Sequence, residues 1–116
     1  MNDCVFCKIV RGEIPSDKIY ESDNFISILD ANPKFEGHTI VISKKYLENL
    51  IELPSSFGEE LLECVKETAS ILMKKYEAEG FNFMNNNSEV AQQLIPHLHF
   101  HILPRKKGDG EIKIVH

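Results

Sequence analysis

The chain has 116 residues, 42% hydrophobic and 27% charged, which suits one compact domain and is too short for two. The 13 Lys and Arg against 18 Asp and Glu give a formal net charge of -5 at pH 7, so no basic field attracts nucleic acid or anionic lipid. No apolar run reaches the roughly 18 to 20 residues of a membrane span, and no secretory signal pattern opens the chain. We therefore expect a single cytoplasmic domain over residues 1–116 that binds neither nucleic acid nor membrane.

The N-terminal half is predicted to contain one short helix and three strands. A helix is expected at residues 6–10, with Gly12 and Pro15 ending it. The strands are expected at residues 19–20, 25–29 and 38–43, the first two forming a hairpin around a polar turn. The β-branched residues of the third strand favour a pleated surface.

The clearest element of the C-terminal half is a long helix. Ser56 and Glu59 form a capping-box pattern at its start, and Gly80 is expected to cap its end in a left-handed conformation. Apolar residues recur between them at three- and four-residue spacing, so one face should cover a sheet. Further strands are expected at residues 81–84, 98–103 and 112–115. Strands grouped with one long helix predict an α+β fold with an antiparallel sheet.

Three of the five histidines occupy alternate positions of one predicted strand. Because side chains alternate between the faces of a strand, His97, His99 and His101 should project from one face about 6 to 7 Å apart. Each partly buried imidazole needs hydrogen-bond partners, so three together are costly unless they are used. Structural histidines are one alternative. Zinc bound by the His-x-His pair is another, although the neighbouring loop is rich in amide donors, which suit an anion better.

The histidine motif resembles the signature of the histidine triad (HIT) family, and four other segments match the bacterial Hint-like branch of that family in order and spacing. These segments are Phe6-Cys7-Lys8-Ile9 with Gly12-Glu13-Ile14-Pro15, then Leu29-Asp30-Ala31-Asn32-Pro33, then Gly37-His38-Thr39-Ile40-Val41-Ile42 before Lys44-Lys45, and Pro104-Arg105. The resemblance implies a HIT-like fold with one long helix and a short N-terminal helix. It also implies a homodimer with joined sheets and a purine nucleoside monophosphate as ligand.

The resemblance further implies a nucleotide-binding hydrolase, a purine nucleoside phosphoramidase that cleaves a phosphorus–nitrogen bond. In this interpretation His99 attacks the α-phosphate, and water then hydrolyses the nucleotidyl-histidine intermediate. A neutral imidazole is already nucleophilic near pH 7 because its ordinary pKa is about 6.5. His101 would bind the phosphoryl oxygens, His97 would support the site, and His38 would orient the nucleophilic ring. The alternative for His38 is a solvated histidine at a strand end.

The N-terminal half is expected to bind the base and sugar. Asp30 matches the acidic residue that the family uses for the ribose hydroxyls, and a carboxylate can accept two hydrogen bonds from a diol. Walls of a purine slot are expected at Phe6, Ile9 and Leu29, with Val5 and Ile14 beside them. Apolar residues at this spacing are equally well explained as core. None of them distinguishes adenine from guanine.

The loop at residues 85–95 is expected to close over the phosphate. Asn86 and Gln93 match positions where the family places phosphate and leaving-group contacts, and Leu94 lies beside them. Two positions depart from the pattern. Gln92 stands where a glycine is expected, and Leu94 stands where many Hint proteins have a hydroxyl residue. Because backbone amides can still donate to the phosphate, we expect activity with an altered leaving-group preference.

A structural zinc site is the last implication of the resemblance. Cys4, Cys7 and His97 match three of its ligands, but the remaining ligand position holds Tyr46. A tetrahedral site would then be completed by water or another side chain, or would not form. Otherwise Cys7 is a small buried residue and Cys4 an exposed thiol. The reaction itself needs no metal. Two other functions stay open, a non-catalytic nucleotide-binding sensor or interaction protein and a zinc-binding protein that uses the histidine cluster.

Overall fold

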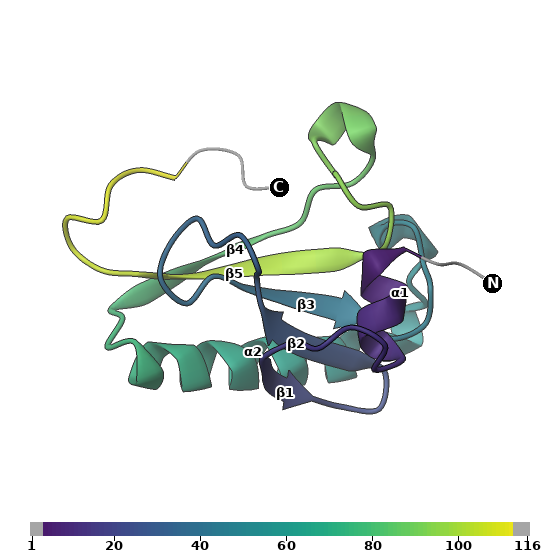
Figure 1. The fold of residues 1–116 in the computed structure, drawn as a ribbon, viewed down its shortest axis with the longest axis horizontal. Helices are drawn as coiled ribbons and strands as arrows, with labels where there is room; N and C mark the ends of the chain where they lie inside the picture. The colour runs from purple at the N-terminus through teal and green to yellow at the C-terminus, as the bar shows by residue number, and fades with distance from the viewer. Residues whose placement is uncertain (1–3, 113–116) are drawn as a thin grey trace.

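The computed structural model describes residues 4–112, which form one antiparallel five-stranded sheet with a helix on each face (Figure 1). The elements in chain order are α1 (Val5–Val10), β1 (Lys18–Glu21), β2 (Phe25–Leu29), β3 (Thr39–Ser43), the 3₁₀ turns η1 (Leu50–Glu52) and η2 (Ser55–Phe57), α2 (Gly58–Lys75), β4 (Gly80–Met84), the 3₁₀ turn η3 (Glu89–Ala91) and β5 (His99–Arg105). The strand order is β1-β2-β3-β5-β4. The α+β prediction is confirmed. Of the predicted strand at residues 112–115, residue 112 is outside any strand and the rest lies beyond the described residues.

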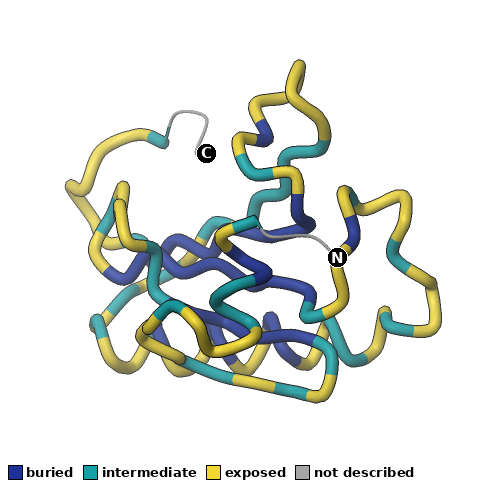
Figure 2. The backbone as a smooth tube through the Cα atoms, turned by 45° about the vertical axis from the view of Figure 1, so that its right-hand side comes forward, coloured by how far each residue is buried: buried dark blue, intermediate teal, exposed yellow. Residues whose placement is uncertain are grey.

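Alternation along the strands divides the core into two layers. One face of the sheet packs against α2, for example through Val41 and Phe100, which lie in one cluster with Leu72. The other face is lined by isoleucines of β2 and β3 that pack with Phe6 of α1. Among residues 4–112, the central strands are accordingly the most deeply buried (Figure 2). No helix of the described residues has the length and apolar character that crossing a bilayer requires.

Both predicted ends of the long helix are wrong. Ser56 lies inside η2, and the residue that caps α2 is Phe57, without a side-chain bond. At the other end Glu77, with φ 53°, takes the left-handed conformation expected of Gly80, which instead begins β4. The N–H of Ala78 bonds to the Met73 carbonyl at 2.9 Å, closing a Schellman motif. The left-handed residue that ends the helix is therefore a glutamate and not the glycine three residues later.

The half-buried carboxylate of Glu60 joins the first hairpin to α2. Glu60 accepts hydrogen bonds from the Ser22 hydroxyl at 2.6 Å and from the backbone and side-chain amides of Asn24 at 2.7 Å each. Burial raises the pKa of Glu60, but these hydrogen bonds outweigh it and the net pKa is lowered. The turn between β1 and β2 is therefore fastened to the first turn of the helix.

Candidate active site

A cavity of about 700 Å³ opens on the face of the sheet that α2 leaves uncovered. Its walls come from α1, the strands β2, β3 and β5, and the loops at residues 14–17, 29–33 and 94–95. Among the predicted nucleotide-binding residues, those that line the cavity are Phe6, Ile9, Leu29, Asp30, Leu94, His99 and His101. The two predicted amides, Asn86 and Gln93, are not among the lining residues of the described chain.

His99 begins β5, and its ring is held by the backbone just before the strand. Its Nδ1 lies 2.7 Å from the carbonyl oxygen of His97. A carbonyl can only accept, so the ring proton sits on Nδ1 and the lone pair on Nε2. The edge of the Phe6 ring packs on the imidazole at a centroid distance of 4.9 Å. Burial lowers the pKa of His99, partly opposed by the His97 carbonyl and Asp30, so the ring is neutral near pH 7.

His38 contacts a different histidine from the one predicted. Its Nε2 lies 3.0 Å from Nδ1 of His101, and Oδ2 of Asp30 lies 3.5 Å from the same Nε2. The prediction that His38 orients the His99 ring is therefore wrong, because in β3 and β5 residue 40 pairs with His101 and brings the end of β3 beside that ring. The solvated alternative is also wrong, since His38 is 1% exposed.

Asp30 divides its two oxygens between the loop and the pocket. Oδ1 accepts a hydrogen bond from the N–H of Asn32 at 2.8 Å, which fixes the start of the loop at residues 30–37. Oδ2 faces His38 at the cavity wall. One carboxylate oxygen thus stays directed toward the site.

Gln93 supports the loop and does not donate into the cavity. Its side-chain oxygen accepts from the N–H of Ser88 at 2.7 Å, and its amide nitrogen donates to the carbonyls of Glu48 at 2.7 Å and Ile95 at 3.1 Å. Both amide protons are therefore used within the protein, which contradicts the predicted phosphate contact in this conformation. Buried side-chain amides are usually hydrogen-bonded within the protein, and the sequence pattern does not show which backbone groups are their partners.

Two further loop residues clarify the departures from the family pattern. Gln92 has φ 69° and lies in the left-handed region, which explains why a glycine is expected at this position. Asn85, to which the sequence analysis assigns no contact, donates to the carbonyl of His99 at 2.9 Å and anchors the strand that carries the candidate nucleophile. The run of three asparagines before the triad was the available signal for this role.

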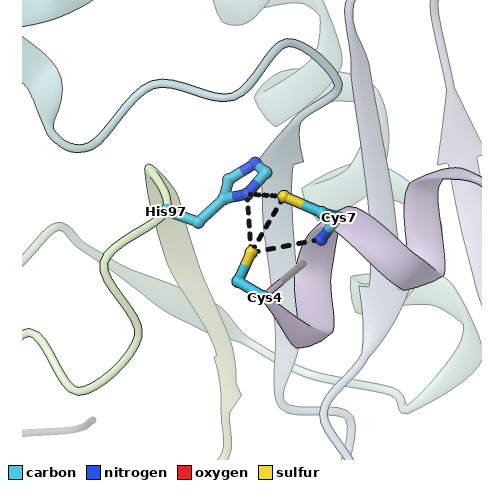
Figure 3. A group of neighbouring side chains, drawn as sticks. All are labelled: Cys4, Cys7 and His97. Carbon is cyan, nitrogen blue, oxygen red and sulfur yellow. Dashed lines mark hydrogen bonds between the residues drawn. The ribbon is translucent and has the colours of Figure 1, made fainter. Parts of the chain in front are cut away.

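The third histidine of the motif belongs to a separate cluster with two cysteines (Figure 3). Nδ1 of His97 lies 3.2 Å from Sγ of Cys4 and 3.3 Å from Sγ of Cys7, and the two sulfurs are 3.0 Å apart. His97 donates from Nε2 to the Ser43 carbonyl at 2.7 Å, so its lone pair on Nδ1 faces the thiols. Burial and the hydrogen bond with Cys4 raise the pKa of the Cys7 thiol to about 11.

This donor set fits zinc. Two thiols and an imidazole are suitable ligands, and a carbonyl behind the histidine is the usual outer partner of a zinc-bound imidazole. Tetrahedral coordination would require nitrogen–sulfur distances of about 3.5 Å, roughly 0.3 Å beyond the observed 3.2 and 3.3 Å, and a sulfur–sulfur distance of about 3.8 Å, so the two thiols would have to separate by about 0.8 Å from the observed 3.0 Å. Tyr46 lies where the remaining ligand is expected, with its ring centroid 5.4 Å from that of His97.

The geometry does not favour one metal ion shared by the three histidines of the motif. Nδ1 of His97 faces the thiols, Nδ1 of His99 faces a carbonyl, and Nδ1 of His101 faces His38. The three rings therefore serve three different sets of partners along the strand.

Comparison with protein families matches the HIT domain over residues 11–108. A HIT-like protein of Methanocaldococcus jannaschii is 45% identical over 94% of this chain and 84% of its own length. An adenylylsulfatase of Arabidopsis thaliana is 43% identical over 93% of this chain and 55% of its length, so the chain spans about half of that relative. An adenosine 5'-monophosphoramidase of Candida albicans is 37% identical over 89% of this chain and 70% of its length.

Solved structures agree with these relatives. A HIT-family protein of Bacillus subtilis superposes with a TM-score of 0.87 at 38% identity, covering 99% of this chain and 84% of that one. A zinc-bound histidine triad protein of Mycobacterium smegmatis superposes with a TM-score of 0.84 at 36% identity, covering 91% and 77%.

Proposed function

The chain belongs to the HIT family, and on that premise we propose that it is a purine nucleoside phosphoramidase that works through a nucleotidyl-histidine intermediate. The observation that carries the proposal is the ring of His99, which lines the cavity with its proton held on Nδ1 and its lone pair on Nε2. Relatives named as an adenylylsulfatase and as phosphoramidases support hydrolysis at a nucleotide phosphate. We further propose that residues 1–116 form one HIT domain.

In the proposed first step, Nε2 of His99 forms a bond to the α-phosphorus as the phosphorus–nitrogen bond of the substrate breaks. The amine leaves with the bonding electron pair and takes up a proton from water. In the second step, a water molecule attacks the phosphorus and the bond between phosphorus and Nε2 of His99 breaks. The attacking water loses a proton to solvent, and the nucleoside monophosphate leaves. The ring returns to its neutral form. Splitting one displacement into two is the usual gain from a covalent nucleophile.

The cavity offers a separate wall for each part of such a substrate. Phe6 and Ile9 of α1 and Leu29 at the end of β2 are among the residues that line the cavity, and the mainly apolar lining would suit a purine. In the proposal, Oδ2 of Asp30, which lies 3.5 Å from Nε2 of His38, accepts a hydrogen bond from a ribose hydroxyl, and His101, whose ring contacts that of His99, binds the phosphoryl oxygens. Leu94 lies at the rim, where the leaving group would pass.

We include a structural zinc ion in the proposal, held by Cys4, Cys7 and His97. When bound, zinc would connect the start of α1 to the segment that leads into β5, and the chemical steps would not pass through it. A reducing compartment such as the cytoplasm would keep the cysteines available as thiols, the state in which they occur here.

A homodimer is the proposed assembly. β4 is an edge strand of the sheet, and Phe81 and Phe83 project from it with exposed fractions of 43% and 45%. An edge strand with exposed aromatic side chains is a ready surface for pairing with a second copy.

Turnover of a fluorogenic adenosine phosphoramidate tests the enzymatic proposal. We expect His99→Ala to lower kcat by at least about a thousandfold, because removing a covalent nucleophile leaves only binding and electrostatic effects. Leu62→Ala, on the exposed face of α2, is the matched control. Wild-type protein treated with EDTA should stay active, whereas loss that zinc restores would favour a metal-dependent reaction. Equal rates for wild type and His99→Ala would favour a non-catalytic nucleotide sensor.

A further inference from the structure

A backbone amide determines where the His38 ring carries its proton. The N–H of Lys34 donates to Nδ1 of His38 at 3.1 Å. An N–H cannot accept, so Nδ1 must present a lone pair, and neutral His38 carries its proton on Nε2. The ring is 1% exposed and its pKa is lowered by burial, with Asp30 opposing and Lys34 adding to the effect, so it is neutral near pH 7.

The proton on His38 in turn determines the state of His101. Nε2 of His38 lies 3.0 Å from Nδ1 of His101, and because His38 is the donor, Nδ1 of His101 must accept. Neutral His101 then carries its own proton on Nε2. His99 has the opposite tautomer, with its proton on Nδ1. Neighbouring histidines of one strand are thus set as a nucleophile and a hydrogen-bond donor.

The loop that supplies the Lys34 amide is closed by its own hydrogen bonds. Oδ1 of Asp30 accepts from Asn32, the N–H of Asp30 donates to the His38 carbonyl at 2.9 Å, and the N–H of His38 donates to the Phe35 carbonyl at 3.0 Å. Gly37 has φ +83°, and a Cβ there would lie 2.7 Å from the ring of Tyr76. These constraints hold the N–H of Lys34 within hydrogen-bond distance of Nδ1 of His38.

We propose that the Lys34 backbone amide and the His38 ring are positioning groups that keep an N–H on Nε2 of His101, ready to donate to a phosphoryl oxygen while His99 attacks. The role in catalysis rests on the proposed function, whereas the assignment of the protons rests on the hydrogen bonds alone. Donors fixed before the reaction stabilise developing negative charge without reorganisation.

The same hydrogen bonds disfavour a metal ion at this end of the cavity. Ligand atoms of Asp30, His38 and His101 lie within 4.8 Å of one another, a spacing that a metal could use. A metal on Nε2 of His38 would require the ring proton on Nδ1, directly against the N–H of Lys34. The group therefore forms a directed chain of hydrogen bonds from amide to His38 to His101.

Nitrogen-15 NMR of the wild-type protein near pH 7.5 tests the proton positions directly, because protonated and unprotonated imidazole nitrogens differ widely in chemical shift. We expect the proton on Nε2 in His38 and His101 and on Nδ1 in His99. A proton on Nδ1 of His101 would overturn the inference even in an active enzyme. The expected tautomers in a protein without turnover would instead overturn the proposed function and the catalytic role that rests on it.

Two variants at one position test the amide. Lys34→Ala and Lys34→Pro lose the same side chain, but only the proline removes the backbone hydrogen. We expect kcat of the proline variant to be about tenfold or more below that of the alanine variant, comparable to the loss of about 10- to 100-fold when the hydrogen-bond partner of a metal-bound histidine is removed. The His38 and His101 shifts should change in the proline variant alone. Equal kcat and equal shifts in the two variants would overturn the inference.

Substitutions of His38 give an independent test if the proline variant does not fold. His38→Gln keeps an N–H that can donate to Nδ1 of His101, whereas His38→Leu removes the donor at similar volume. We expect His101 to keep its proton on Nε2 in the glutamine variant, with kcat about tenfold above that of the leucine variant. Equal kcat together with an unchanged His101 tautomer in both variants would contradict the positioning role.

Discussion

His99 and His101 of β5 have different hydrogen-bond partners, the carbonyl of His97 for one ring and His38 for the other. Alternation along a strand predicted that His99 and His101 share a face, and both line the cavity. The partner of each ring is a backbone group or a residue far away in the chain, such as the Lys34 amide for His38. Such contacts depend on how a loop closes, which no local pattern of residues specifies.

Leu94 provides a residue-scale prediction about the leaving group. Its side chain lines the cavity yet is 68% exposed, so an apolar leaving group could cover it. Covering about 40 to 60 Å² of apolar surface at about 25 cal/mol per Å² corresponds to an effect of about five- to twelvefold. We expect Leu94→Ser to lower by that factor the ratio of kcat/KM for an indolyl-amine substrate to that for a lysine-amine substrate.

Leu62→Ser is the matched control, because Leu62 is 57% exposed on α2, away from the cavity. Its kcat/KM ratio should stay within about twofold of wild type, since no apolar leaving group reaches it. If Leu94→Ser keeps the wild-type ratio as well, the leaving group does not contact Leu94.

At the scale of elements, the interior of α2 followed from its apolar spacing, while its ends did not. The C-terminal end of a helix depends on the direction that the following chain takes. Here the chain turns at Glu77, and β4 begins at Gly80. The Ser56 and Glu59 pattern was present, but the preceding 3₁₀ turn left its side-chain bonds unformed. Local signals therefore identified the helix but misplaced both boundaries.

The hydrogen bonds between Glu60 of α2 and the first hairpin predict that the free energy of unfolding depends on pH. Because the pKa of Glu60 is lowered in the folded state from its ordinary 4.5, its stabilisation is complete above that pH and is lost as the pH falls through the folded value. We expect Glu60→Gln to lower the free energy of unfolding by about 1 kcal/mol at pH 7, a figure reduced by solvent screening.

Urea unfolding of both proteins at several pH values measures this effect. The difference in the free energy of unfolding between wild type and Glu60→Gln should shrink steadily once the pH falls below 4.5. A difference that stays constant down to acid unfolding would mean that the carboxylate charge contributes nothing to the contact.

At the scale of the whole molecule, the sheet order and the cavity arise from pairings between distant segments. β5 lies between β3 and β4, which places His99 and His101 on an interior strand and leaves β4 at the edge. The resemblance of five segments to one family anticipated this arrangement better than periodicity did. Periodicity identified the faces of strands, whereas strand order depends on contacts across the chain.

The exposed edge predicts the behaviour of the assembly. We expect the protein to be a dimer at micromolar concentration and Phe81→Lys to be monomeric, since a lysine on an edge strand opposes pairing. Phe83 is a poorer probe because its ring stacks on buried Phe100 at a centroid distance of 5.4 Å. Ile51→Lys, at a site 90% exposed in η1, is the control and should stay dimeric.

Sedimentation equilibrium of the three proteins distinguishes the outcomes. A wild type that is monomeric at every concentration, or a Phe81→Lys variant that dimerises as tightly as wild type, would contradict an interface at β4.

The central claim is that Nε2 of His99 bonds to phosphorus during turnover. Rapid quenching at alkaline pH, which preserves phosphorus–nitrogen bonds, followed by peptide mass spectrometry measures this most directly. We expect a nucleotidyl mass increase on the peptide containing His99, absent from His99→Ala. Sustained turnover with no adduct in the burst phase, or an adduct on any other residue, would contradict the account.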